Sequence, residues 1–242
     1  MAVPGFNHFW SLAVEEQFYL LWPAVIWLVP DRKRMVQIAV GMVVLAPLIR
    51  AGIWIFDLPV LGTYVLTPSR MDSLAMGSLV FFLMQKHGVA ARVEGASKMI
   101  FAVCALAVAI LFSVSGTSSM SLPVSIAGFS LLSLLFSAVL TITISAKPSV
   151  IKAICNHAVL RAAGKYSYAM YILHPSVRRV LLDKITPHIS IPTLFGSDLP
   201  RQIFVYAVGF GATFVLALIS WYVIESHFIK LKDRFPSASP RF

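Results

Sequence analysis

The sequence has 242 residues, of which 58% are hydrophobic and only 12% are charged, and its mean hydropathy is +0.83. Soluble domains carry about 25% charged residues, and a single globular core could not hide this much apolar surface, so a soluble fold is excluded. The net charge is +10, but the basic residues lie in short segments between apolar runs, where they set membrane topology. The composition therefore predicts a membrane protein that is surrounded by lipids and has no nucleic-acid partner.

The apolar runs are roughly 15 to 24 residues long and lack strict alternation, which is typical of membrane helices rather than barrel strands. We therefore expect an all-α, polytopic transmembrane helical bundle with about seven spans, in a single domain over residues 1–242. In chain order, the expected spans are 10–29, 35–56, 71–85, 99–115, 122–144, 166–183 and 202–224.

The basic residues also predict an orientation. Most of the 20 Lys and Arg residues fall on one side of a seven-span arrangement, in the segments 32–34, 86–98 and 145–165 and in the C-terminal tail. By the positive-inside rule this side is cytoplasmic, which places the C-terminus inside and the N-terminus outside. The first ten residues lack the features of a signal peptide. Because an N-terminus on the outer side must still be carried across the membrane, we expect that earlier spans precede this chain.

Neither a disulfide bond nor a bound metal ion is expected. Cys104 lies in an apolar run and Cys155 in a basic loop, which does not make a disulfide framework. The His, Cys and carboxylate residues do not show the spacing of a metal-ligand set.

The first expected span carries a polar stripe. Ser11, Glu15 and Tyr19 recur at every fourth position and Trp22 follows, so the four side chains share one helix face. Polar groups within a membrane are costly and are functional candidates by default. The alternative is that Glu15 and its neighbour Glu16 mark the membrane edge beside an interfacial tryptophan.

The second span contains an arginine, Arg50, near its outer end. A guanidinium group stays charged and needs a counter-charge within a membrane. We expect Glu15 or Glu16 of the first span to be its partner.

Arg70 flanks the third span and Asp72 lies in its first turn, so both are at its outer mouth, where they are candidates for substrate binding. The alternative is that they anchor the helix or pair locally. Ser73 and Gly77 are small residues four positions apart, a spacing that predicts close approach of another helix.

A second polar stripe lies in the sixth span. Ser167, Tyr171, His174 and Arg178 follow one helix face, and Pro175 removes a backbone hydrogen bond beside the histidine. His174 could act as a base or bind a polar substrate. The alternative is a structural histidine that is hydrogen-bonded to a neighbouring span.

These segments carry a family resemblance. Residues 8–23, HFWSLAVEEQFYLLWP, closely resemble the signature of the membrane acyltransferase-3 family, the bacterial O-acetylases of lipopolysaccharide, exopolysaccharide and related glycans. Residues 70–77 (RMDSLAMG) are similar to the family's Arg-x-Asp-x-Leu-x-x-Gly helix. Residues 164–175 (GKYSYAMYILHP) and 222–225 (YVIE) resemble its two late motifs. The order and spacing agree over essentially the whole chain.

The resemblance implies an integral enzyme of about ten spans in the bacterial cytoplasmic membrane. It would pass an acyl group, usually acetyl from acetyl-CoA, to a hydroxyl group of a cell-surface sugar or glycolipid, without a tightly bound cofactor. The residues at matching motif positions or on the adjoining polar stripes give the candidate site: Glu15 and His174 as catalytic groups, and Trp10, Ser11, Glu16, Tyr19, Arg70, Asp72, Tyr171 and Arg178 as substrate-binding groups.

The sequence also departs from the family pattern. Family members begin with an Arg-Gly turn, a helix with the histidine usually taken as catalytic, and an Arg-x-x-Arg pair linked to the acyl donor, and none of these appears in this sequence. We therefore expect a need for missing N-terminal helices, and an inactive remnant stays open as an alternative. A glycan or lipid transporter is the other alternative, because polar stripes and a proline kink also fit a translocation path.

Overall fold

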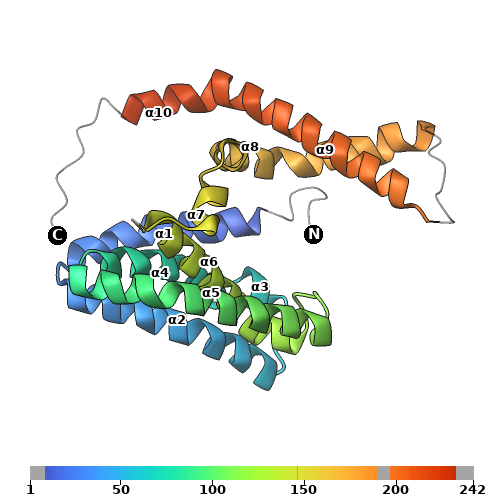
Figure 1. Cartoon of the computed structure of the whole chain (residues 1–242). Helices are drawn as coiled ribbons and strands as arrows, with labels where there is room; N and C mark the ends of the chain where they lie inside the picture. Colours follow the sequence, from blue (N-terminus) through green and yellow to red (C-terminus); the bar gives the residue numbers. More distant parts are fainter. Residues whose placement is uncertain (1–8, 146, 190–196, 233–242) are drawn as a thin grey trace. The chain divides into compact units, whose positions relative to one another are not determined.

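The computed structural model describes residues 9–145, 147–189 and 197–232. These residues form helices and no β-strand, as the sequence predicts (Figure 1). In chain order the elements are α1 (Trp10–Leu28), α2 (Arg32–Ile55), α3 (Gly62–Val65), α4 (Thr67–Met84), α5 (His87–Ser115), the π-helix η1 (Val124–Gly128), α6 (Phe129–Ile144), α7 (Val150–Cys155), α8 (Ala158–Val180), the π-helix η2 (Leu181–Ile185), the 3-10 helix η3 (Thr186–His188), α9 (Leu199–Ser220), the π-helix η4 (Trp221–Glu225) and α10 (Ser226–Lys232).

Each of the seven predicted spans falls on a long helix. Four helical ranges among the described residues are long and apolar enough to cross a membrane: Arg32–Ile55, Gly88–Ser115, Val124–Ile144 and Leu199–Leu231. The other three predicted spans correspond to α1, α4 and α8, which carry the charged residues of the sequence motifs. Those charges lower the mean hydropathy of a helix without changing its length. The chain is therefore an all-α polytopic membrane protein.

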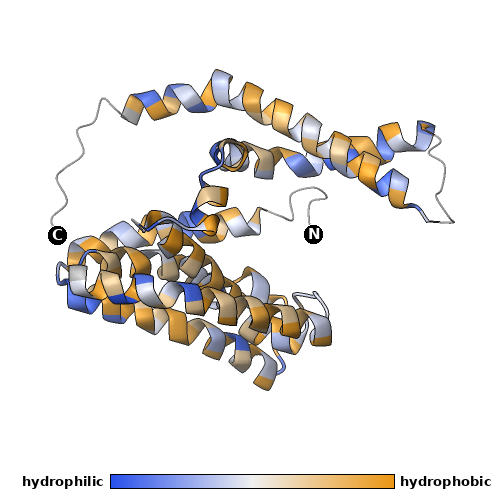
Figure 2. Cartoon of the chain, viewed as in Figure 1, coloured by the Kyte–Doolittle hydropathy of each residue, from blue (hydrophilic) through white to orange (hydrophobic). Residues whose placement is uncertain are grey.

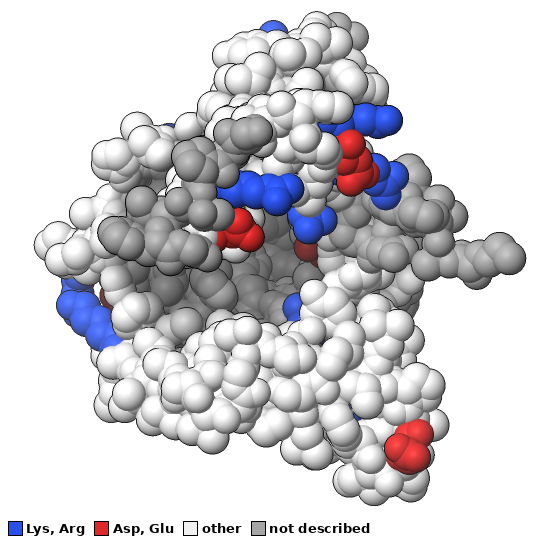
Figure 3. Space-filling view, turned by 90° about the vertical axis from the view of Figure 1, so that its right-hand side faces the viewer, with Lys and Arg blue, Asp and Glu red and all other residues white. Residues whose placement is uncertain are grey.

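The apolar side chains point mostly outward. In the most apolar 18-residue stretch of each membrane-crossing range only 11% to 28% of the residues are buried, so most of this apolar surface is left for contact with lipid. Hydrophobic residues predominate along these helices (Figure 2), and uncharged residues dominate the face shown in Figure 3. Apolar exposure on this scale marks a membrane-embedded surface.

The described residues form two compact units, 9–155 and 156–232. In the first unit α4 packs against α2 and α6, α5 packs against α6, and α1 contacts α3 and α4. In the second unit α8 packs along α9 around Tyr166, Ala169 and Ala217, and a T-shaped contact joins Tyr166 to Trp221. The prediction of one domain over the whole chain stays a prediction.

The start of α2 shows how the basic segment 31–34 builds the first unit. Asp31 caps the helix, because its carboxylate accepts hydrogen bonds from the backbone N–H groups of Lys33 (3.2 Å) and Arg34 (3.4 Å). The Arg32 guanidinium donates to the Phe82 carbonyl oxygen near the end of α4, with an Nε–O distance of 3.0 Å. That carbonyl is in the last turn of α4, a part of a helix whose carbonyl oxygens commonly accept hydrogen bonds from outside the helix. The contact therefore fastens the start of α2 to the end of α4.

The predicted close helix approach at Gly77 is wrong. A Cβ atom placed on Gly77 would meet nothing within 4 Å, and the residue lines a cavity of about 240 Å³ beside Trp22 and Phe81. Ser73 does contact another helix, since its Oγ lies 2.8 Å from the Oγ of Ser133 in α6. The small residue that packs tightly in α4 is Ala75, which is 0% exposed.

Candidate active site

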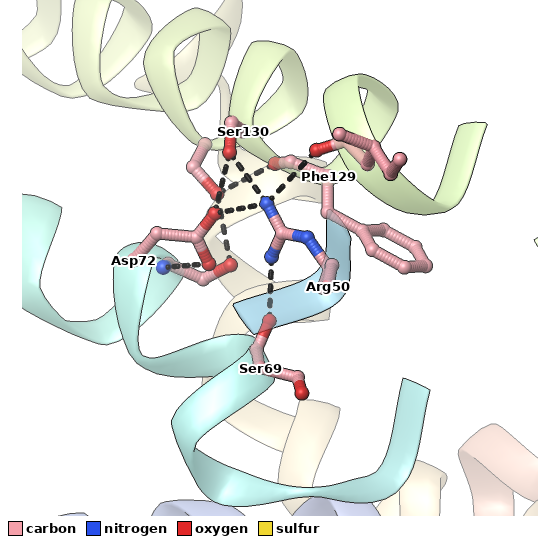
Figure 4. Close-up of polar contacts among 8 residues, drawn as sticks. Arg50, Ser69, Asp72, Phe129 and Ser130 are labelled. Carbon is pink, nitrogen blue, oxygen red and sulfur yellow. Dashed lines mark hydrogen bonds and ion pairs between the residues drawn. The ribbon is translucent and has the colours of Figure 1, made fainter. Parts of the chain in front are cut away.

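A buried ion pair joins α2 to α4. Arg50 Nη2 lies 2.9 Å from Asp72 Oδ2, and both side chains are 0% exposed (Figure 4). Arg50 Nη1 donates a second hydrogen bond to the Ser69 carbonyl oxygen. Leaving either charge alone in this position would be strongly unfavourable, because a buried ion has lost its hydration. The pair therefore fixes the register of α2 against the start of α4.

Helix α6 completes this network. Ser130 Oγ donates to Asp72 Oδ2 (2.7 Å) and accepts from Arg50 Nη2 (2.6 Å), while the Ile126 carbonyl oxygen accepts from the same nitrogen at 3.1 Å. Ile126 belongs to the π-helix η1, whose wider turn leaves this carbonyl oxygen turned toward the arginine. Three helices, α2, α4 and α6, thus meet at one buried charge pair.

The partner of Arg50 differs from the predicted one. We expected Glu15 or Glu16, but Asp72 holds the guanidinium, and both glutamates are exposed on α1. The spacing of residues along the sequence does not show how two separate helices align. It therefore could not distinguish a carboxylate on α4 from one on α1 as the partner of Arg50. The alternative that Asp72 pairs locally on α4 is not met either, because its ion-pair partner lies on α2.

A second arginine, Arg70, lies next to the network in an aromatic slot. Its guanidinium carbon is 4.2 Å from the centre of the Phe129 ring and 5.8 Å from the centre of the Tyr64 ring. Arg50 approaches the same Phe129 ring at 5.6 Å. Arg70 Nη1 is buried and has no hydrogen-bond partner among the described residues. Two guanidinium groups against one carboxylate leave an excess positive charge at this point.

The motif helix α1 forms one wall of the slot. The Trp10 ring lies 4.3 Å from the Tyr64 ring, between their centres, and Gln17 Oε1 accepts a hydrogen bond from Thr67 Oγ1 on α4. Val14 is the buried residue of α1. The sequence did not single out Tyr64 or Phe129, since neither belongs to a polar stripe.

The remaining motif residues of α1 lie elsewhere on the helix. Glu15, Glu16 and Tyr19 are exposed, and Ser11 is half-buried. The structure therefore brings Trp10 and Arg70 to the same aromatic cluster, whereas the two glutamates lie exposed on α1. Their predicted contacts with substrate stay predictions.

In the second unit, the predicted stripe on α8 lines a cavity. Tyr171, His174 and Arg178 contribute to the wall of a cavity of about 510 Å³ between α8 and α9, together with apolar residues of both helices. Ser167 does not line this cavity, and its Oγ donates to the Gly164 carbonyl oxygen at 2.8 Å. Three of the four stripe residues are thus gathered at one site.

The ring of His174 is oriented by its own helix. Its Nδ1 lies 2.7 Å from the Tyr171 carbonyl oxygen, and its ring is 5.8 Å from the Tyr171 ring. A carbonyl oxygen only accepts, so we assign the proton to Nδ1, and in the neutral ring Nε2 keeps its lone pair. The imidazole therefore has the tautomer that a base at Nε2 requires.

The described residues contain no group of three or more His, Cys, Asp or Glu side chains that could hold a metal ion.

The late motif 222–225 lies in the π-helix η4, where Glu225 accepts a hydrogen bond from Ser220 Oγ at 3.0 Å. This carboxylate therefore has a structural partner within its own helix. The chemistry available at the two sites is that of guanidinium, imidazole, carboxylate and aromatic groups.

Comparison with known proteins adds to this geometry. The family model described as an acyltransferase domain matches residues 2–224. The chain is 28% identical over 232 residues to the peptidoglycan O-acetyltransferase OatA of Listeria monocytogenes. The matched region covers 91% of this chain and 34% of that protein. The chain is also 27% identical over 235 residues to the O-acetyltransferase OatA of Staphylococcus aureus. Here the matched region covers 93% of this chain and 36% of that protein. The chain thus spans little more than a third of the length of these relatives, and no solved structure gives a significant match.

Proposed function

Because the chain belongs to the acyltransferase-3 family, we propose that it transfers an acetyl group from acetyl-CoA to a hydroxyl group of a cell-surface sugar. The named relatives are O-acetyltransferases, and the printed name of the Listeria protein makes peptidoglycan one candidate acceptor. The proposed location is the bacterial cytoplasmic membrane with the C-terminus in the cytoplasm. The clustering of basic residues in segments 32–34, 86–98 and 145–165 supports this orientation.

The reaction sets two demands on the protein. The sugar hydroxyl oxygen attacks the thioester carbonyl carbon, a C–O bond forms, the C–S bond breaks, and the sulfur of coenzyme A takes up the proton. A base must remove the hydroxyl proton. A donor must stabilise the negative charge that develops on the carbonyl oxygen.

The aromatic slot around Arg70 is the observation that carries the proposal. A guanidinium held between Phe129 and Tyr64 is fixed in direction, and its buried Nη1 has no hydrogen-bond partner among the described residues. A donor that is oriented before the reaction and is shielded from water stabilises an oxyanion far better than a solvated one. We assign Arg70 to the developing oxyanion and Trp10, next to Tyr64, to the wall against which the substrate packs.

Glu15 and His174 are the two candidates for the base. His174 has the tautomer that a base at Nε2 requires. Glu15 belongs to the most specific family motif and lies exposed on α1, where it could accept hydrogen bonds from sugar hydroxyl groups. Arg50, Asp72 and Ser130 act as positioning residues, since they hold α4, and with it Arg70, against α2 and α6.

The experiment measures acetyl transfer in membranes from a host without its own glycan O-acetylase. The chain is expressed there and supplied with radiolabelled acetyl-CoA and isolated peptidoglycan, and alkali-labile acetate on the glycan is counted. We expect ester-linked acetate with the wild-type chain and its loss in Glu15→Gln, because the amide cannot take up a proton. Glu94→Gln, on the cytoplasmic end of α5, serves as the matched control and is expected to keep wild-type transfer.

Two results would contradict the proposal in different ways. Wild-type transfer in Glu15→Gln would remove Glu15 from the reaction and leave His174 as the base, to be tested in the same assay with His174→Gln. Absence of label on the glycan from the inserted wild-type chain would reject the proposed transfer for this chain.

A further inference from the structure

The cavity between α8 and α9 has an apolar body. Its volume is about 510 Å³, and its wall includes Met170, Leu181, Phe210 and Thr213. Thr213 lies about 18 Å along the helix axis from Arg201 at the start of α9. The cavity volume falls within the range of about 300 to 1,000 Å³ that is usual for ligand sites. The cavity is therefore large enough to receive an extended apolar chain.

One end of this cavity is polar and cationic. Arg178, Val205 and Tyr206 also line a second cavity of about 270 Å³, so the two cavities adjoin. The second cavity adds Arg201, Gln202 and Asp198 to the wall. Neither Arg178 nor Arg201 forms an ion pair within the described part of the chain. Two guanidinium groups against the one carboxylate of Asp198 leave a positive charge there.

The polar end lies near the last turn of α8, which continues into η2, and near the first turn of α9. Arg178 is in the last turn of α8, and Arg201 is in the first turn of α9. The N-terminus of a helix of this length also carries a partial positive charge and unpaired N–H groups, which favour an anion. The apolar part of the cavity extends from this point toward the middle of the same helices, that is, toward the interior of the membrane.

From this arrangement we infer that the α8–α9 cavity is a binding site for an anionic phospholipid of the surrounding bilayer. The acyl chain occupies the apolar cavity, and the phosphate group accepts hydrogen bonds from Arg178 and Arg201. Guanidinium groups are suited to this role because they bind phosphate oxygens in a bidentate manner. The inference goes beyond the proposed acetyl transfer and does not depend on it.

The experiment titrates dioctanoylphosphatidylglycerol into the purified full chain in a neutral maltoside detergent and measures the one-to-one complex by native mass spectrometry. Dioctanoylglycerol, which lacks the phosphate, is the matched neutral probe. We expect the anionic lipid to reach half-saturation at a concentration at least about tenfold lower than the neutral probe needs, since hydrogen bonds to charged groups contribute on this scale. We expect Arg178→Gln and Arg201→Gln each to weaken its binding about tenfold, with no effect on the neutral probe.

Two control variants test the position of the site. Arg179→Gln removes a neighbouring exposed cation that lines neither cavity, so binding should be unchanged. Gly209→Leu fills the apolar cavity, where an added Cβ would lie 3.3 Å from Leu181 Cδ1, and should weaken the binding of both probes. Gly211→Leu, where a Cβ would meet nothing within 4 Å, should weaken neither. A thermal unfolding curve for each variant verifies that it is folded.

Three outcomes would overturn the inference: equal affinity for the anionic and neutral probes, equal weakening by Arg178→Gln and Arg179→Gln, or binding of inorganic phosphate as tightly as the lipid. The acetyl-transfer assay is separate from this titration. A chain that binds the lipid but transfers no acetate refutes only the proposed function, and a chain that transfers acetate without preferring the anionic lipid refutes only the lipid site.

Discussion

Arg50 and Asp72 show how much of this protein depends on single charges. Each has lost all of its exposed surface, and each supplies the counter-charge that makes burial of the other tolerable. Their contacts reach α2, α4 and α6, and the neighbouring Phe129 ring connects them to Arg70. The stability of the first unit and the position of the proposed oxyanion donor therefore depend on the same pair.

We expect Asp72→Asn to lower the free energy of unfolding by about 3 to 5 kcal/mol, because it leaves the Arg50 charge buried and unpaired. The double variant Arg50→Met with Asp72→Leu should recover most of this loss, since it removes both charges. Thermal unfolding of the purified chain in detergent checks both values. Asp57→Asn, at an exposed residue with φ of 51°, is the control and should unfold as the wild type does. A double variant less stable than Asp72→Asn would contradict the pairing.

Arg70→Lys tests the aromatic slot under the proposed function. Lysine keeps the charge but lacks the planar fork that stacks on Phe129. Loss of an oxyanion donor costs about 10² to 10³ in kcat, so we expect a decrease of this size in acetyl transfer with little change in KM. Arg92→Lys, in the basic segment of α5, is the matched control. An unchanged kcat in Arg70→Lys would show that the slot is not where the oxyanion forms.

At the scale of elements, the positions of helices could be predicted from the sequence, but not their pairing. Hydropathy located every long helix, although α5 begins at His87 and α8 at Ala158, well before the predicted 99 and 166. Those first turns contain polar residues, and hydropathy detects the apolar run rather than the helix. The membrane-crossing helices are apolar on nearly all sides, so no face of them indicated a neighbour. Arg50 was consequently assigned to the wrong carboxylate.

The same reason explains which part of the candidate site was found. Tyr171, His174 and Arg178 share one face of one helix, so their spacing predicted their common position, and the cavity between α8 and α9 contains all three. Phe129 and Ser130 contribute from α6 to a site on α2 and α4, at the end of a π-helix. No local pattern distinguishes these two residues from the many other Phe and Ser residues of an apolar segment.

The role of α6 can be tested by comparing two of its serines. Ser130→Ala removes a hydroxyl group that both donates to Asp72 and accepts from Arg50, and we expect a loss of about 1 to 3 kcal/mol in the free energy of unfolding. Ser137→Ala removes a hydroxyl that only donates to Ser133 within the same helix, and it should cost much less. Equal unfolding temperatures for the two variants would show that Ser130 does not support the charge pair.

At the scale of the whole molecule, the proposed orientation makes a prediction about Cys155. The thiol lies at the end of α7, partly exposed, within the basic segment 145–165, whereas Cys104 is buried. With this segment in the cytoplasm, a membrane-impermeant maleimide should label the chain in inverted vesicles and not in intact spheroplasts. Cys155→Ser should abolish the labelling, and Cys104→Ser should leave it unchanged. Labelling of Cys155 in intact spheroplasts would reverse the assigned orientation.

The Arg50–Asp72 pair also has a consequence for how the chain is made. Synthesis proceeds from the N-terminus, so α2 reaches the insertion machinery before Asp72 exists, and it carries a guanidinium group that has no counter-charge at that moment. An arginine within an inserting helix costs about 2.5 to 3.5 kcal/mol at the centre of the bilayer and less toward its edge. Helix α2 therefore gains its full preference for the membrane only when α4 arrives.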